Sequence, residues 1–107
     1  MFARNIAISL KPNSVTEFAQ KLEDEEVPIL RKQGGFRDMI FLLSDDNIYV
    51  HAISLWESRQ NAEAYKTTAY AEVLKSLETI VTGKPRVRAS TVVHSTMQVL
   101  TPTAAAA

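Results

Sequence analysis

The chain has 107 residues, 46% of them hydrophobic and 22% charged, which is typical of one globular domain. Its 12 basic residues balance 12 acidic ones, which argues against nucleic-acid binding and electrostatic membrane attachment, since both depend on excess positive charge. The absence of cysteine excludes disulfides, thiol nucleophiles and thiolate metal sites.

Hydropathy and histidine content indicate where the protein is located and whether it binds a metal. No stretch approaches the roughly 18 consecutive apolar residues of a membrane-spanning helix, and the N-terminus lacks an apolar run of signal-peptide length. We therefore expect a cytoplasmic protein that does not contact a membrane. His51 and His94 are the only imidazoles, too few for a dedicated zinc or iron site, so we expect no metal.

The N-terminal part of the sequence predicts a strand followed by a helix. Apolar side chains alternate with small or polar ones over residues 2–10, which indicates a strand. Ser14 and Glu17 are spaced as a capping box that would begin the helix. Pro28 should kink or restart that helix, and Gly34-Gly35 should end it.

Two further strands follow and should pair as a hairpin. They are predicted over residues 36–43 and 48–56, separated by a Ser-Asp-Asp-Asn turn at 44–47. Both strands are apolar on both faces, whereas a face exposed to water should be polar at every second position. Exposing several such side chains would cost about 1.5–3 kcal/mol each. A second copy packed on the open face would remove this cost, so we expect a homodimer.

The remaining sequence predicts a second helix and a last strand. Ser58 is placed to cap the helix, Thr67-Thr68 is a weak point within it, and an apolar stripe continues to Val81. Gly83 and Pro85 should stop the helix, and residues 86–94 should form the final strand.

The predicted order is therefore β-α-β-β-α-β, an α+β fold of ferredoxin-like type. It would have a four-stranded antiparallel sheet with helices on one face, dimerised into an α+β barrel. We assign residues 1–100 to this domain and expect residues 101–107, which lack a core-forming pattern, to be a disordered tail.

Several short stretches, in this order and spacing, resemble the antibiotic biosynthesis monooxygenase family of dimeric α+β barrels. The resemblance covers roughly residues 1–95 and is carried by Ala3-Arg4-Asn5, Gly34-Gly35-Phe36-Arg37, Ser54-Leu55-Trp56-Glu57-Ser58, Ala62-Glu63-Ala64-Tyr65 and Pro85-Arg86-Val87. It implies either cofactor-independent oxidation of aromatic polyketides, or heme degradation, or no known activity. The heme-degrading branch has a Trp and a His where this chain has Tyr65 and, nearby, Lys75, so heme degradation is not expected.

Four residues are candidates for a site. Trp56 is either a core anchor or a stacking wall for a planar ligand. Tyr65 is a second candidate for a pocket wall. Asn5 would either stabilise a developing oxyanion or cap a backbone edge. His51 would be either the general base that deprotonates a phenol or a structural or interface residue.

The leading functional hypothesis is cofactor-independent oxidation of a small aromatic or quinol compound by these four residues. A non-catalytic small-molecule-binding or structural dimer is the main alternative. An isomerase or decarboxylase of the same architecture would need an acid/base pair such as His51 with a carboxylate.

Overall fold

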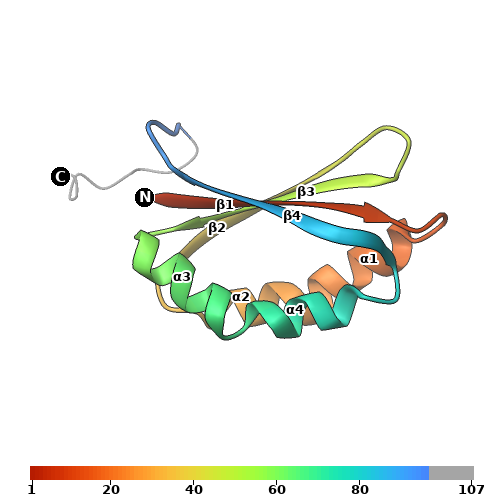
Figure 1. Cartoon of the computed structure of the whole chain (residues 1–107), viewed down its shortest axis with the longest axis horizontal. Coiled ribbons are helices and arrows are strands. Elements are labelled where there is room, and N and C mark those ends of the chain that lie inside the picture. Colours follow the sequence, from red (N-terminus) through yellow and green to blue (C-terminus); the bar gives the residue numbers. More distant parts are fainter. Residues whose placement is uncertain (97–107) are drawn as a thin grey trace.

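The computed structural model describes residues 1–96. Its elements, in chain order, are β1 (Phe2–Leu10), α1 (Val15–Lys21), the π-helical turn η1 (Leu22–Glu26), α2 (Val27–Arg31), β2 (Phe36–Leu43), β3 (Tyr49–Trp56), α3 (Arg59–Thr67), α4 (Tyr70–Leu77) and β4 (Val81–Thr91). The four strands form an antiparallel sheet in the order β2-β3-β1-β4. All helices lie against a single face of this sheet (Figure 1). The expected ferredoxin-like α+β fold is confirmed; the predicted tail at 101–107 lies outside the described residues.

The register of the strands decides which side chains face the helices. Even-numbered residues of β1 and β3 point toward the helical layer, because Phe2, Ile8, Leu10, Val50 and Trp56 are buried there. Directly paired residues share a face. The other face, called here the outer face, therefore carries Asn5 and Ala7 of β1 with their partners on β3 and β4: Ile53, Arg88, His51 and Arg86.

The first helical segment differs from the prediction at its start and its middle. Ser14 precedes α1, but its backbone (φ −105°, ψ 1°) is not in the extended region that aims a capping side chain, and it makes no capping hydrogen bond. The predicted capping box is therefore wrong. The interruption expected at Pro28 is present as η1, and Pro28 lies in the first turn of α2.

The second helical segment is split as the Thr67-Thr68 weak point suggested, and Ser58 does cap α3 by accepting the Asn61 N–H at 3.2 Å. The second helical segment ends earlier than its sequence predicts, because α4 stops at Leu77. Val81 pairs with Leu10 in β4, and the N–H of Lys11 donates to the Ile80 carbonyl at 2.8 Å. Pairing with β1 therefore places Val81 in a strand, although its spacing in the sequence favours a helix. β4 tolerates Gly83 and Pro85 because it is an edge strand.

The outer face retains large apolar side chains in contact with solvent. Leu42 is 51% exposed and Tyr49 is 54% exposed, and both lie beside the exposed His51. Among residues 1–96, none of the helices has the length and apolar character needed to cross a membrane.

Candidate functional site

The cleft, as the term is used here, is a group of separate hollows between the helices and the sheet. Three hollows form it. One of about 500 Å³ lies between the end of α4 and the start of β4, and one of about 260 Å³ lies between α3, β1 and β4. A cavity of about 30 Å³ lies deeper, between the helices and the sheet. Tyr70 lines both the deep cavity and the 260 Å³ pocket, while Ile8, Leu74 and Leu77 line both the deep cavity and the 500 Å³ pocket.

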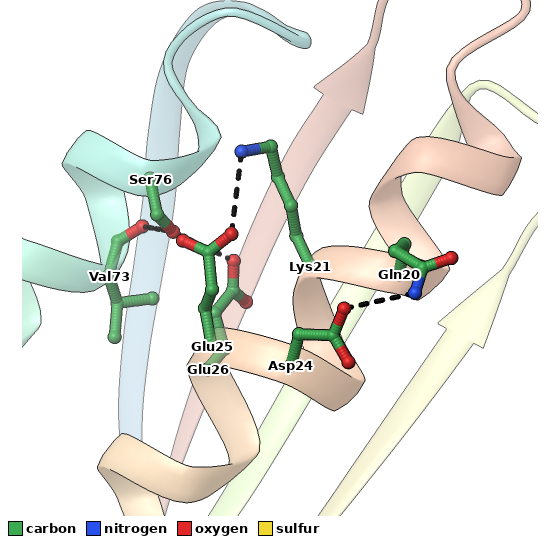
Figure 2. A network of polar contacts seen from close by, with 7 residues as sticks. All are labelled: Gln20, Lys21, Asp24, Glu25, Glu26, Val73 and Ser76. Carbon is green, nitrogen blue, oxygen red and sulfur yellow. Dashed lines mark hydrogen bonds and ion pairs between the residues drawn. The ribbon is translucent and has the colours of Figure 1, made fainter.

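Glu26 is the acidic side chain that lines the deep cavity. It is 2% exposed and accepts a hydrogen bond from Ser76 Oγ at 3.1 Å, and Ser76 Oγ also donates to the Val73 carbonyl at 2.8 Å. Figure 2 shows Glu26 facing Ser76 on the neighbouring helix, next to the Lys21–Glu25 ion pair. Burial raises the pKa of the Glu26 carboxyl to about 7, against the lowering effect of the Ser76 hydrogen bond.

The π-helical turn explains why a carboxyl group lies there. Phe18, Leu22, Glu26 and Leu30 are spaced four residues apart, and in a regular α-helix such a series drifts around the axis by about 40° per step. One wider turn over Leu22–Glu26 compensates for this drift. Glu26 therefore occupies the buried side of the helix between Phe18 and Leu30.

Aromatic rings form a continuous row beside this cavity. Trp56 is fully buried and stacks on Tyr65 with ring centroids 5.0 Å apart and an interplanar angle of 28°. Tyr65 contacts Tyr70 at 5.8 Å, and Trp56 Nε1 donates to Ser54 Oγ at 2.9 Å. Burial raises the pKa of both tyrosines, while the charge of Arg4 opposes that shift. Both tyrosines therefore stay protonated near neutral pH and can donate hydrogen bonds.

The four residues predicted from sequence form two pairs on opposite faces of the sheet. Trp56 and Tyr65 lie on the helical side, where Tyr65 lines the deep cavity and Trp56 packs behind it. Asn5 and His51 lie together on the outer face, with His51 Nδ1 3.3 Å from Asn5 Oδ1. The sheet separates the two pairs, so one chain does not bring all four residues into a single site.

Sequence reasoning missed Glu26 and Arg4. Glu26 has a visible signal, a carboxylate in an i, i+4 series of apolar residues. Arg4 has one too, a charged residue in phase with Phe2, Ile6 and Ile8 on the buried face of β1. A charged side chain at a buried position of an otherwise apolar face is costly unless it is paired with another group or binds a ligand.

Comparison with protein families identifies the chain. Residues 1–76 match the family model described as antibiotic biosynthesis monooxygenase. The chain belongs to this family. The resemblance inferred from the sequence is therefore confirmed, and the cleft lies within a monooxygenase-family fold. A comparison with curated proteins gave no match.

Solved structures with this fold share little sequence with the chain. A monooxygenase of Streptomyces coelicolor, ActVA-Orf6, in complex with nanaomycin D has a TM-score of 0.74 at 18% identity, covering 91% of both chains. A variant of MhuD with two manganese protoporphyrin IX molecules per active site has a TM-score of 0.71 at 15% identity, covering 92% of this chain and all of that one. Mycobacterium tuberculosis Rv0793 has a TM-score of 0.68 at 14% identity, covering 89% and 97%. At these identities the similarity establishes the fold alone.

Metal ligands do not gather in the described part of this family member. Within residues 1–96 no group of three or more His, Asp or Glu side chains is placed to hold a metal ion.

Proposed function

We propose that this protein is an oxidoreductase that oxidises a small aromatic or quinol compound with molecular oxygen and without a cofactor. The observation that supports this most directly is the buried Glu26 carboxyl, with a pKa of about 7, in an apolar cavity lined by Tyr65 and Tyr70. A base is most effective when its pKa lies near the working pH. Cytoplasmic residence is part of the same proposal.

The ligand would bind in the outer hollows and direct one hydroxyl group inward. The 500 Å³ and 260 Å³ hollows have room for an aromatic ring system, whereas the deep cavity of about 30 Å³ holds about one hydroxyl group or water molecule. A phenolic hydroxyl that enters it meets Glu26. The protonated Tyr65 and Tyr70 can then donate hydrogen bonds to the anion that forms.

The chemistry needs only the substrate and oxygen. Glu26 takes the phenolic proton, and the resulting aryloxide gives up electrons to O2 as a carbon–oxygen bond forms at a ring carbon. Glu26 returns the proton to the peroxide, and the hydroperoxide then loses its terminal OH together with the hydrogen of the attacked ring carbon as water, which leaves a quinone. One oxygen atom remains in the product and the other leaves as water, so the substrate itself supplies all the electrons.

Oxygen uptake tests this proposal. With a panel of naphthols and hydroquinones, we expect the wild-type protein to consume oxygen, and Glu26→Gln to lower kcat by about 100-fold or more. Under ¹⁸O2 one labelled atom should appear in the quinone. Glu23→Gln, an exposed carboxylate in the same π-helical turn, is the matched control and should leave the rate unchanged. Equal rates for Glu26→Gln and wild type would refute the role of Glu26.

Asn5 and His51 provide a second assignment for the base, supported by their 3.3 Å contact. A base at His51 would act on a ligand at the outer face, next to Leu42 and Tyr49. His51→Ala separates the two assignments. If His51 is the base, this variant loses oxygen uptake while Glu26→Gln retains it. If Glu26 is the base, the reverse holds.

We further infer a homodimer formed through the outer face, supported by the exposed Leu42 and Tyr49. The alternative function is a non-catalytic binding or structural dimer. The zero exposure of Trp56 and its contacts with Phe36 and Tyr65 favour that reading, because they suit a core residue. Saturable binding of naphthols without any oxygen consumption would establish the alternative.

A further inference from the structure

Arg4 is a buried cation whose terminal nitrogens lack partners. Its side chain on β1 is 3% exposed, and neither Nη1 nor Nη2 has a hydrogen-bond partner among the described residues. No ion pair joins Arg4 to an acidic group within residues 1–96. Burying an unpaired charge is costly, and buried polar groups are almost always hydrogen-bonded. The two terminal nitrogens of Arg4 are therefore unused within the described part of the chain.

The aromatic rings of Tyr65 and Tyr70 hold the guanidinium in place. Its central carbon lies 4.4 Å from the Tyr70 ring centroid and 5.3 Å from that of Tyr65. Such cation–π contacts stabilise the charge. They fix the plane of the group, and a side-chain hydrogen bond between Arg4 and Tyr70 also lowers the Tyr70 pKa, while Nη1 and Nη2 remain without a partner among the described residues.

The guanidinium lines the 260 Å³ pocket. Lys66 adds a second positive charge to the wall, and Phe2, Val87 and Ala89 make much of the remainder apolar. Glu63 also lines this pocket but forms no ion pair with Arg4 in the described part of the chain. The pocket therefore combines two cations and one carboxylate with an apolar wall, and this excess of positive charge suits a ligand that is both anionic and hydrophobic.

We propose that Arg4 binds a carboxylate of the substrate, so that this protein prefers hydroxylated aromatic carboxylates to phenols that lack the carboxylate. The planar guanidinium fork matches the two oxygens of a carboxylate. Tyr70 borders both this pocket and the cavity of Glu26. A ring carrying a carboxylate and a hydroxyl group would span the two, with the carboxylate on Arg4 and the hydroxyl toward Glu26. Only the placement of the hydroxyl group toward Glu26 rests on the proposed oxidation. The binding of a carboxylate by Arg4 does not depend on it.

Anaerobic calorimetry with a matched ligand pair tests the assignment independently of turnover. The probes are 3-hydroxy-2-naphthoate and 2-naphthol, which differ by one carboxylate. Wild type should bind the naphthoate about 10- to 100-fold more tightly, as expected for a charged hydrogen-bonded pair. Arg4→Met should remove this preference while leaving the affinity for 2-naphthol unchanged.

Arg59→Met is the matched control. Arg59 also lies over an aromatic ring, 5.0 Å from the centroid of Phe2, but it is exposed and does not line this pocket. Its replacement should leave the preference intact. Thermal melts check folding, and Arg4→Gln, which keeps a polar side chain, repeats the test if Arg4→Met does not fold.

The outcomes separate this inference from the proposed function. An Arg4-dependent preference without oxygen uptake would support the carboxylate site and refute the oxidation. Oxidation of naphthols by a wild type that binds both probes equally would overturn the carboxylate site alone. A preference that survives in Arg4→Met, or in Arg4→Gln, would also overturn it.

Discussion

Glu26 occupies a position where the helix would gain stability from an apolar side chain. Its neighbours at i−4 and i+4 are Leu22 and Leu30, and the latter is 1% exposed. Ser76 supplies one hydrogen bond to the carboxyl group, which is less than a buried carboxylate needs. Near neutral pH the protonated form is therefore well populated, and the site can both release and accept a proton.

The raised pKa makes the stability of the protein depend on pH. The Glu26 pKa is about 7 in the folded chain against a reference of 4.5, so the folded state binds this proton more tightly. Its contribution is fully present below pH 4.5 and is lost as the pH rises through 7. Across that range wild type should lose up to about 3 kcal/mol relative to Glu26→Gln.

Denaturant melts of the two proteins from pH 4 to pH 8.5 measure this difference. Glu23→Gln, exposed in the same turn, should run parallel to wild type throughout. A constant gap between wild type and Glu26→Gln would mean that the carboxyl group titrates in its ordinary range.

At the level of elements, the junction between α2, β2 and α3 sets where Tyr65 lies. Gly35 has a φ of +78°, and a Cβ placed there would overlap the side chain of Asn61 in the first turn of α3. Asn61 in turn bonds Ser58, the residue that caps α3. The glycine therefore allows the β2 entry and the start of α3 to approach closely, and α3 carries Tyr65 to the cleft.

Replacing the two adjacent glycines should have unequal effects. Gly35→Ala should destabilise the fold by about 1–3 kcal/mol, because the new side chain meets Asn61 in a backbone conformation that disfavours it. At Gly34 the nearest atom to a new Cβ is Asn61 Nδ2 at 3.9 Å, an ordinary contact. Gly34→Ala should therefore be close to neutral. Thermal unfolding of the pair measures this, and equal melting temperatures would contradict the close-approach argument.

The sequence pattern predicted strands and helices correctly where one face of the element is buried and where the turn residues form their own hydrogen bonds. The 44–47 turn is an example, since Asp46 accepts the Ile48 N–H at 3.1 Å and Ser44 Oγ accepts the Tyr49 N–H at 2.9 Å. The prediction failed at Val81, where a long-range pairing with Leu10 decides the structure. Spacing within a segment carries no information about such a partner.

The same limit applies to the site. Alternation correctly placed Asn5 off the Ile6–Ile8 face, and Asn5 does lie on the outer face with His51. Which face holds the cleft depends on where the helices pack, and that is a property of the whole fold. Sequence reasoning therefore selected plausible residue types without placing them around one cavity.

At the scale of the whole molecule, the proposed homodimer depends on the outer face. Leu42 is about half exposed in the single chain, and it sits opposite His51 across the strand pair. We expect wild type to sediment at twice the 11.9 kDa chain mass, because a second copy would bury this face. Leu42→Asp should give monomers, since it places a charge in the interface.

Analytical ultracentrifugation at micromolar concentration checks this expectation. Ala64→Asp introduces the same charge at an exposed position of α3, on the helical side, and should stay dimeric. A wild type that sediments as a monomer would refute the homodimer.

The irregularity in β4 bears on how copies of this chain can meet. Three residues, Gly83 to Pro85, stand opposite Ile8 alone, between the pairs Ala7–Arg86 and Ser9–Thr82. This bulge, with a proline that has no N–H to offer, makes the free rim of the sheet a poor template for another strand. Lateral addition of strands, which would grow a ribbon or a fibre, is thereby discouraged at β4.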